Sequence, residues 1–386
     1  MIKNIGIVAT PNISTGGGFP RVVRDLIASL NELNYKVSLM TPFTLDYEKI
    51  KELYGPIKLE KVHYPSGFKK KFCKEDSITR RLMKSEFLKM FNENDLVIDM
   101  DGKILDKYLS TEEKKRYIIW RVSCAYSDTK KFPEMRRGLS RKGKEILKDL
   151  LNTKSTRPGK DIKIYSLDEW TAKELKYYWN LNSAGFLNPE IQVEHIKYKG
   201  QKKKNQIAVL GRIARNKKIH DSIEIFSKGT SKFKDYKLVI LGGATPDSDL
   251  YIKELSNQIE RLNIKERVEM IPNPSFEKIK EILLNSKILI DSQQGVSLTM
   301  TAIEAMAAGC IVLATKNGGT YLEVLGKGKY GFGFDNIKEG GNKLEQIILE
   351  LNSKKLNYHK FIKGADKFSH KNFIKRLKEI INNINV

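Results

Sequence analysis

Two fixed cations stand close together in the segment GRIARNKK, which begins at Gly211 and directly follows a short apolar run. Arg212 and Lys217 are five residues apart, and a loop at a strand end would point both side chains into one cleft. An arginine can grip a phosphate through two hydrogen bonds, whereas a lysine adds a mobile point charge. Together they could neutralise a departing diphosphate as its charge develops. Two ordinary surface charges explain the same pattern equally well.

A second group of candidate residues lies between Asp291 and Gly319, where we predict a strand end, a polar loop, a helix, a buried strand and a glycine turn. The predicted helix, 299–308, is rich in Ala, Met and Glu. Its first N–H groups would favour an anion, because they lack helical partners and lie at the positive end of the helix dipole. Glu304 could accept hydrogen bonds from a neutral diol such as a ribose. The alternative is an ordinary helix with one solvated glutamate. The anion-binding candidates are the amides of Ser297, Leu298 and Thr299.

Both groups of residues need strands that carry them to a common edge, and the chain contains two series of alternating strands and helices. The first series starts with a strand at 5–9, a glycine loop at 15–18, a helical pattern and a strand at 37–40. The second starts with a strand at 207–210, after a polar linker at 197–205. Such alternation favours parallel, doubly wound sheets. We therefore predict an α/β chain of two Rossmann-like domains that face each other across a cleft. Further strands are expected at 237–241, 268–271 and 311–313, with helices at 219–226, 251–262 and 276–284 and a last helix at 373–384.

The composition excludes several classes of protein. The 386 residues are 40% hydrophobic, which is enough for packed cores, and no run approaches the roughly 20 apolar residues of a membrane span. The N-terminus, MIKNIGIVATPN, predicts a strand and a turn instead of a signal peptide, so we expect a cytoplasmic protein. Three cysteines and five histidines are scattered without metal spacing, so we expect neither a metal nor another cofactor.

Lys and Arg outnumber Asp and Glu by 70 to 46, which gives a formal net charge of +24. This excess predicts an anionic partner, such as phosphate ligands, an acidic membrane surface or nucleic acid, although a lysine-rich proteome explains it as well. Basic residues concentrate at 66–74 and at 130–151, and the second segment is amphipathic. Such segments can lie on anionic lipid, and a solvated helical face is the alternative. Nucleic acid is disfavoured because only Phe68 and Phe72 could stack beside these cations.

In their order and spacing, these motifs resemble a known family. GRIARNKK, the later LGG, IEAMAAGCIVLAT and NGG resemble the C-terminal domain of GT-B glycosyltransferases, in particular the retaining, nucleotide-sugar-dependent family four (glycosyl transferases group 1). TGGGFPRVVRDL resembles the family's GG-x-x-R-x-V loop and helix, and SLDEWTAKEL resembles its Ser-x-Trp-Thr segment. The likeness covers the chain in outline. It is specific from Ile207 to Gly319 and loose from Tyr54 to Lys160.

The resemblance implies a role for each candidate residue. Arg212 and Lys217 would hold the donor diphosphate and assist its departure, and Glu304 would bind the nucleotide ribose. The family retains the anomeric configuration and needs no metal, through same-face attack in which the leaving phosphate helps to deprotonate the acceptor. The other implied donor-binding residues are the amides of Ser297, Leu298 and Thr299 at the phosphates, Gly16 and Gly17 in a loop that closes over the donor, Pro272 and Asn273 at the base, and Gly242.

One position departs from the family pattern, which is Glu-x7-Glu with the first Glu beside the donor sugar. The residue eight positions before Glu304 is Val296. A two-residue insertion would put Gln294 there instead, whose amide can still hydrogen-bond sugar hydroxyls. The family's frequent histidine after an N-domain strand is also missing from YIIWRVSCAYSD. Asp99 and Asp101 are polar candidates near the cleft, although aspartates at strand ends are more often turn residues.

We therefore expect a hexosyltransferase that uses a UDP or GDP sugar, with a lipid or a lipid-linked glycan as acceptor and a peripheral contact with the inner membrane face through 66–74 and 130–151. The alternatives are an acceptor that is a protein, a soluble saccharide or a nucleic acid, and a non-catalytic sugar- or polyanion-binding module on a decayed fold. The expected domains are an acceptor domain at 1–198, a donor domain at 206–365 and a C-terminal helix at 366–386 that packs back on the first domain. The sequence leaves the donor, the acceptor and the oligomeric state open.

Overall fold

Seven parallel strands form the first sheet in a computed structural model that describes residues 2–65, 77–100, 105–122, 158–356 and 358–384. The strand order β3-β2-β1-β4-β5-β6-β7 places β1 inside the sheet, and the chain extends the sheet in both directions from it. This reversal of direction defines a doubly wound sheet and puts the loop after β1 at the switch point. The strands are β1 (Asn4–Val8), β2 (Lys36–Met40), β3 (Lys61–His63), β4 (Leu96–Asp99), β5 (Tyr117–Arg121), β6 (Lys163–Ser166) and β7 (Gly185–Phe186). The described helices are α1 (Gly18–Glu32), α2 (Tyr47–Tyr54), α3 (Ser77–Glu93) and α6 (Glu169–Trp179), with short 3₁₀ turns at Leu105–Tyr108, Glu113–Arg116 and Val193–Ile196.

Six parallel strands form the second sheet, in the order β10-β9-β8-β11-β12-β13. Its switch point lies between β8 and β11, which pair directly although two strands separate them in the chain. The strands are β8 (Gln206–Leu210), β9 (Lys237–Gly242), β10 (Val268–Pro272), β11 (Ile288–Asp291), β12 (Ile311–Thr315) and β13 (Phe332–Phe334). The helices are α7 (Ile219–Gly229), α8 (Asp249–Arg261), α9 (Phe276–Asn285), α10 (Met300–Ala307), α11 (Ile337–Asn352), α12 (Tyr358–Ala365) and α13 (His370–Asn382), with one turn of π-helix at Thr320–Val324.

The two doubly wound sheets confirm the predicted α/β class. The strand predicted at 207–210 is β8, and the strands predicted at 237–241 and 268–271 are β9 and β10, each one residue longer than expected. The prediction found these strands because they contain short apolar runs. β8 and β9 are mostly buried, whereas β10 lies at the sheet edge and has no fully buried residue. It did not find β3, β7 and β13, which have only two or three residues each and lie toward or at the sheet edges.

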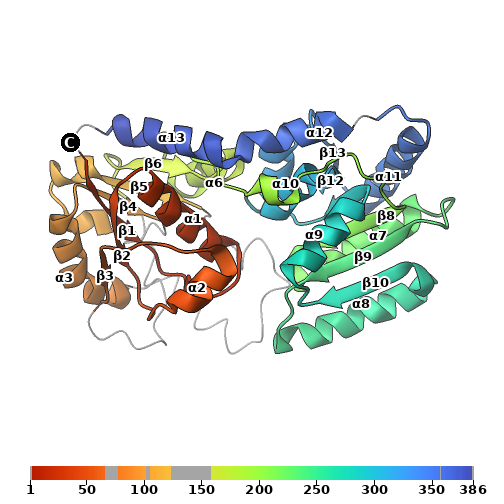
Figure 1. Ribbon diagram of the computed structural model, residues 1–386, viewed down its shortest axis with the longest axis horizontal. Helices are drawn as coiled ribbons and strands as arrows, with labels where there is room; N and C mark the ends of the chain where they lie inside the picture. The colour runs from red at the N-terminus through yellow and green to blue at the C-terminus, as the bar shows by residue number, and fades with distance from the viewer. Residues whose placement is uncertain (1, 66–76, 101–104, 123–157, 357, 385–386) are drawn as a thin grey trace.

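The last helices run along one side of both domains (Figure 1). The Phe373 ring of α13 packs against the Trp120 ring of β5, with 6.0 Å between the ring centroids. Just before α13, the Phe368 carbonyl accepts a hydrogen bond from the Ile191 N–H, at 2.9 Å. The chain therefore crosses between the domains twice, and α13 ends over the N-terminal sheet.

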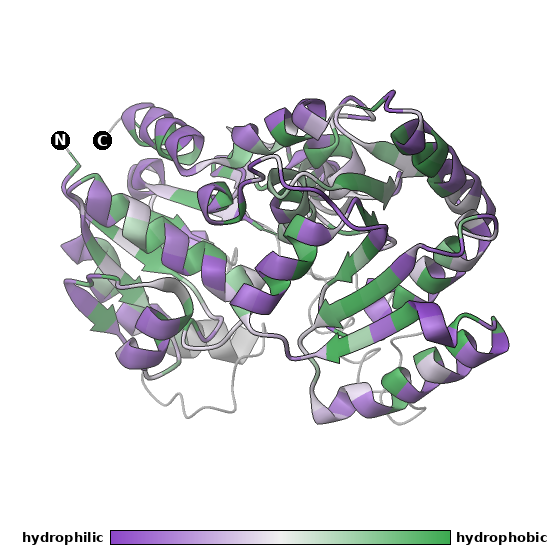
Figure 2. Cartoon of the chain, turned by 45° about the vertical axis from the view of Figure 1, so that its right-hand side comes forward, coloured by the Kyte–Doolittle hydropathy of each residue, from purple (hydrophilic) through white to green (hydrophobic). Residues whose placement is uncertain are grey.

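The hydropathy of the elements explains this packing. The strands of both sheets are mostly hydrophobic, whereas the outer helices alternate between hydrophobic and hydrophilic residues along their length (Figure 2). One continuous buried cluster contains Ile5 from the first sheet, Leu289 from the second, Met306 from α10 and Phe373 from α13. The domains thus share part of their apolar core next to the cleft.

Lys203 is buried in the segment that the sequence predicted as a polar linker, and only 8% of it is exposed. Its ammonium donates to the carbonyl oxygens of Ser286 at 2.7 Å and Ala308 at 2.8 Å, and also contacts those of Leu284 and Leu283 at 3.1 and 3.3 Å. These carbonyls terminate α9 and α10, where a helix leaves acceptors without partners. One lysine therefore caps two helices and joins them.

We expect Lys203→Met to destabilise the protein by about 3 kcal/mol, because buried carbonyls that a charged donor satisfies would lose their partner. Urea unfolding followed by circular dichroism measures the change. Lys202→Met is the matched control, since Lys202 is exposed and surface substitutions change stability by about 0.5 kcal/mol or less. Equal unfolding midpoints for the two variants would show that the buried contacts of Lys203 contribute nothing.

Candidate active site

A cavity of about 350 Å³ lies between the two domains. From the N-terminal side, the cavity is lined by Gly17 at the end of the loop after β1 and by Gly18 and Phe19 at the start of α1. The C-terminal domain contributes residues from the ends of β8 and β11 and from the first turn of α10. The carboxyl ends of parallel strands and the switch points of both sheets therefore meet at this cavity, as expected for a ligand site in such folds. From the C-terminal domain, the polar lining consists of Arg212, Lys217, Ser222, Asp291, Ser292, Gln293, Ser297, Thr299 and Thr301.

Arg212 and Lys217 both line the cavity. Lys217 lies at the end of a 3₁₀ turn, Arg215–Lys217, and its side chain folds back against Gly211. Burial lowers the pKa of Lys217; the Asp291 carboxylate opposes the shift, and the Arg212 charge adds to it. Two cations against the single carboxylate of Asp291 leave this part of the cavity with a net positive charge, which suits an anion such as a diphosphate.

Asp291, which the sequence reading did not single out, organises the loop between β11 and α10. Its Oδ2 accepts hydrogen bonds from the hydroxyls of Thr299, at 2.7 Å, and Thr320, at 3.1 Å. Its Oδ1 accepts from the N–H of Gln293, at 3.2 Å. A carboxylate at a strand end looks like an ordinary turn residue in the sequence, and only the fold shows its contact with the π-helical turn at 320–324.

Two of the three amides predicted to bind phosphate already donate hydrogen bonds to side chains of the protein. The N–H of Leu298 donates to Asp168 Oδ2 at 2.5 Å, and the N–H of Thr299 donates to Thr320 Oγ1 at 3.2 Å. Both amides are therefore already hydrogen-bonded within the protein. Ser297 lines the same cavity, and its N–H has no hydrogen-bond acceptor among the described residues.

Asp168 connects the two domains through that contact. It caps α6 by accepting from the N–H and the hydroxyl of Thr171, both at 2.7 Å. Its second oxygen reaches Leu298 in the other domain. Burial raises the pKa of the Asp168 carboxyl, and the donors from Thr171 and Leu298 oppose this rise. An alanine at Gly319 would collide with this carboxylate, so the second glycine of the NGG turn leaves room for the contact.

Glu304 does not line the cavity, and 8% of it is exposed. It lies in α10 and is paired with Arg21 of α1, with 2.6 Å between Nη1 and Oε1. Arg21 also lies 3.6 Å from the buried Asp25 carboxylate. The predicted ribose-binding residue is thus joined to the N-terminal domain.

The candidate base-binding residues lie at the neighbouring strand ends. Pro272 is the last residue of β10, and the N–H of Asn273 donates to the Gly242 carbonyl at 2.9 Å. The Asn273 side chain in turn accepts from the N–H of Ala244 at 2.8 Å. This pair of loops borders the loop of the two cations, because the Ile213 N–H donates to the Gly243 carbonyl at 2.8 Å.

Gly16 and Gln294 lie outside the cavity lining, as do the predicted residues Glu304, Pro272, Asn273 and Gly242. Gly16 precedes the lining residue Gly17, and a side chain at Gly16 would meet no atom within 4 Å. Gln294 is also absent from the lining, whereas its neighbour Gln293 belongs to it. The assumed two-residue insertion singled out Gln294, whereas the loop conformation places its neighbour Gln293 at the cavity.

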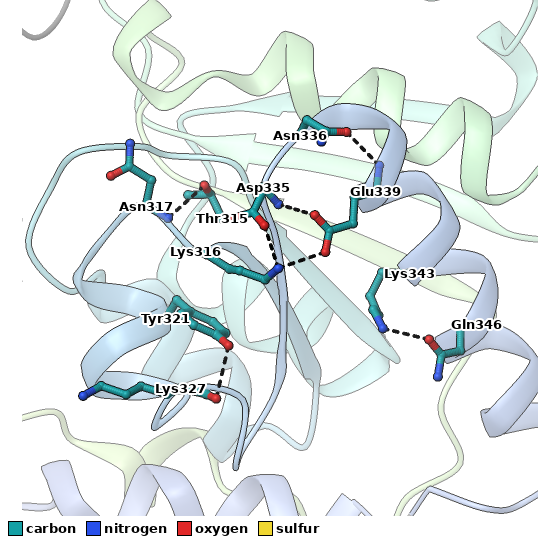
Figure 3. A network of polar contacts seen from close by, with 10 residues as sticks. All are labelled: Thr315, Lys316, Asn317, Tyr321, Lys327, Asp335, Asn336, Glu339, Lys343 and Gln346. Carbon is teal, nitrogen blue, oxygen red and sulfur yellow. Dashed lines mark hydrogen bonds and ion pairs between the residues drawn. The ribbon is translucent and has the colours of Figure 1, made fainter.

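A polar network fixes the turn that follows β12 (Figure 3). Lys316 donates to Asp335 at 2.7 Å and to Glu339 at 3.0 Å, and these two carboxylates raise its pKa. Asn336 caps α11 by accepting from the N–H of Glu339. The Asn317 N–H donates to the hydroxyl of Thr315, the last residue of β12. The network thus anchors the start of the NGG turn to α11, next to the 297–299 loop.

The remaining sequence candidates have other positions. Asp99 is fully buried and accepts a hydrogen bond from the Tyr117 hydroxyl, so it serves the N-terminal core. Asp101 and the segments 66–74 and 130–151 lie outside the described residues. In the described part of the chain, no helix is long and apolar enough to cross a membrane. Nor does that part contain a cluster of three or more side chains that could hold a metal, and the absence of a cofactor stays a prediction.

Comparison with solved structures supports the architecture. The chain superposes on Anabaena Alr3699/HepE, solved in complex with UDP, with a TM-score of 0.71, 15% sequence identity, and coverage of 99% of this chain and all of the other. The lipopolysaccharide outer core galactosyltransferase WaaB gives a TM-score of 0.68 with 15% identity, over 98% of this chain and 99% of the other. These likenesses, together with the two sheets and the cavity between them, define the GT-B fold, as the sequence predicted.

A family profile described as "Glycosyl transferases group 1" matches residues 190–368. This match covers the C-terminal part of the chain, and it bears out the predicted resemblance to that family and the predicted class of enzyme, a glycosyltransferase. Over 161 residues, the chain is 31% identical to alpha-1,3/1,6-mannosyltransferase ALG2 of Dictyostelium discoideum. The matched stretch is 40% of this chain and 38% of that protein. The chain thus matches well under half of this relative's length.

Proposed function

We propose that the chain is a retaining glycosyltransferase that moves a hexose from a nucleoside diphosphate sugar to an acceptor hydroxyl. The observation that carries the proposal is the pair of Arg212 and Lys217 in a cavity lined by both domains. A diphosphate is the leaving group that two adjacent cations would stabilise best, because its negative charge grows as the bond to the sugar breaks. The cavity volume of about 350 Å³ lies within the usual range for small-molecule sites.

The reaction would break the bond between the sugar C1 and the diphosphate oxygen and form a bond between C1 and the acceptor oxygen on the same face. The acceptor proton would pass to the leaving phosphate. Among the described lining residues, Asp291 is the only acidic one. Both of its carboxylate oxygens already accept hydrogen bonds from hydroxyl or N–H groups of the protein. This arrangement favours the departing phosphate as the proton acceptor over a side chain of the protein.

Relatives suggest which donor and acceptor to test first. The ALG2 relative is named as a mannosyltransferase. A mouse relative is named GDP-Man:Man(3)GlcNAc(2)-PP-Dol alpha-1,2-mannosyltransferase. It is 31% identical over 90 residues, which are 23% of this chain and 18% of that protein. We therefore propose GDP-mannose as the donor and a lipid-linked glycan as the acceptor, reached by peripheral contact with a membrane. The net charge of +24 suits an anionic lipid surface.

The test is a panel of GDP and UDP sugars, in which released nucleoside diphosphate reports turnover and calorimetry reports binding. Each donor is combined with a lipid-linked saccharide in anionic vesicles, or with the same saccharide in soluble form. We expect turnover with one donor, and a faster rate with the vesicle-borne acceptor.

The outcomes separate the alternatives. Faster turnover with the soluble saccharide would replace the lipid-linked acceptor by a soluble one and leave the transferase in place. Saturable binding of a sugar or polyanion, without binding of any nucleoside diphosphate, would instead favour the non-catalytic module. No saturable binding of any nucleotide sugar would contradict the proposal as a whole.

A further inference from the structure

The ion pair between Arg21 and Glu304 joins the two domains beside the cavity. Arg21 lies in the first turn of α1, and Glu304 lies one turn into α10, so each residue belongs to a helix that begins at the cavity. The N-terminal ends of these helices also touch, because a side chain at Gly18 would lie 2.9 Å from the Met300 methyl group. The pair therefore forms where the donor domain meets the other domain.

Both members of the pair are largely shielded from water, with 19% of the Arg21 side chain and 11% of the Glu304 side chain exposed. A carboxylate in such a place needs a counter-charge, and removal of one partner leaves the other charge buried without compensation. The contact occupies Oε1 of Glu304, and no described residue is recorded as a donor to Oε2. One oxygen thus remains for a ligand.

A ribose can donate hydrogen bonds to Oε2, but it carries no charge and cannot replace a guanidinium as the counter-ion of Glu304. The nucleotide would therefore add to the ion pair and would not displace Arg21. Neither Arg21 nor Glu304 is a lining residue of the cavity around Lys217 and Arg212, although both of their helices begin at that cavity. If the phosphates bind at Arg212 and Lys217, Arg21 lies away from them and would act through Glu304.

We propose that Arg21 is a positioning residue of the nucleotide site, which holds the Glu304 carboxylate from the opposite domain so that its second oxygen accepts from the ribose diol. The inference rests on the proposed function, because it assumes that a nucleoside diphosphate binds in the cavity. It makes the ribose subsite a joint product of both domains, although only the C-terminal domain supplies the residue that contacts the sugar.

The experiment measures binding of GDP and UDP, and of their 2′,3′-dideoxy forms, by calorimetry on the full chain. We expect Arg21→Ala to weaken binding of the preferred nucleotide by about tenfold to a hundredfold, the usual effect of a lost charged hydrogen bond. The same substitution in a Glu304→Ala background should change the affinity less than about twofold, because two residues that act through one contact are not additive. Arg21→Ala should also abolish the preference for the ribose over the dideoxy nucleotide.

Turnover should show a raised KM for the donor with little change in kcat, since the lost contact serves the ground state and the transition state equally.

Two controls protect the result from a general loss of structure. Arg21→Lys keeps the charge and should restore most of the affinity. An unchanged melting temperature of each variant would show that the fold is intact, which we expect because Asp25 also contacts Arg24. Arg215→Ala breaks an exposed pair with Glu254, outside the cavity lining, and should leave nucleotide binding unchanged. Tighter binding by Arg21→Ala would show that Arg21 competes with the nucleotide. Additive effects of Arg21→Ala and Glu304→Ala would show that Arg21 acts independently of Glu304. Either result would overturn the inference. Failure of the wild type to bind any nucleotide would instead count against the proposed function.

Discussion

Replacement of Lys217 by alanine is expected to lower kcat/KM for the nucleotide sugar by about a hundredfold to a thousandfold, the usual effect of removing a preorganised group that stabilises developing charge. Lys217 lies in the cavity beside Arg212, and the pair would otherwise share the charge of the leaving diphosphate. Released nucleoside diphosphate, measured at several donor concentrations, gives kcat and KM separately. A loss mainly in kcat would place the effect in the bond-breaking step.

The neighbouring Lys218 provides the matched control. Lys218 has the same charge but does not line the cavity, and its backbone is left-handed, with φ of 48°. Asparagine tolerates this conformation, so Lys218→Asn removes the charge with little strain. We expect nearly full activity from this variant. Similar losses in both variants would mean that the general positive field, and not the placed ammonium of Lys217, acts on the donor.

The lowered pKa of Lys217 predicts how donor binding depends on pH. Burial lowers the pKa of Lys217 below its ordinary value of 10.5 in the free protein. Only the protonated form attracts phosphate, so donor affinity should fall as the pH rises through this lowered pKa, before an ordinary lysine would lose its proton. Lys217→Arg should flatten the profile on the alkaline side, because a guanidinium stays charged there.

Gly242→Ala is expected to have the second large effect, because the added methyl group would overlap the carbonyl oxygen of Gly211. Gly211 begins the loop that carries both cations, and its N–H is bonded to Leu241 of the neighbouring strand. Either the loop moves or β9 moves. We expect a loss of about 1–3 kcal/mol in the free energy of unfolding. We also expect a decrease of about a hundredfold in kcat/KM from misplacement of Arg212 and Lys217.

Gly243→Ala is the control for this prediction. A methyl group at Gly243 would meet the nearest atoms at 3.9 and 4.0 Å, which is ordinary contact. Its stability and turnover should stay close to those of the wild type. A Gly242→Ala protein with wild-type turnover would show that the loop after β8 can shift without moving its cations, and Gly242 would then have no part in the site.

Individual residues show how far sequence reasoning reaches into the candidate site. Arg212 and Lys217 could be found because both their types and their place after a strand are local features. Asp291 could not be distinguished from a turn residue, since its partner Thr320 comes 29 positions later and belongs to another element. Lys203 looked like part of a solvated linker for the same reason, because its carbonyl partners come 80 or more residues later in the chain.

The two alternating series of strands and helices, the glycine turns and the loop with two cations could all be predicted from the sequence, because apolar periodicity, backbone propensity and charge are properties of neighbouring residues. Which polar groups already have hydrogen-bond partners within the protein could be seen only in the folded chain. It joined Glu304 to Arg21 and the N–H of Leu298 to Asp168, and both contacts bridge the two domains. Such contacts depend on how two separately folded sheets meet, and the buried core that the domains share fixes this arrangement. No local pattern encodes that arrangement, because each partner is separated from the other by at least 130 residues.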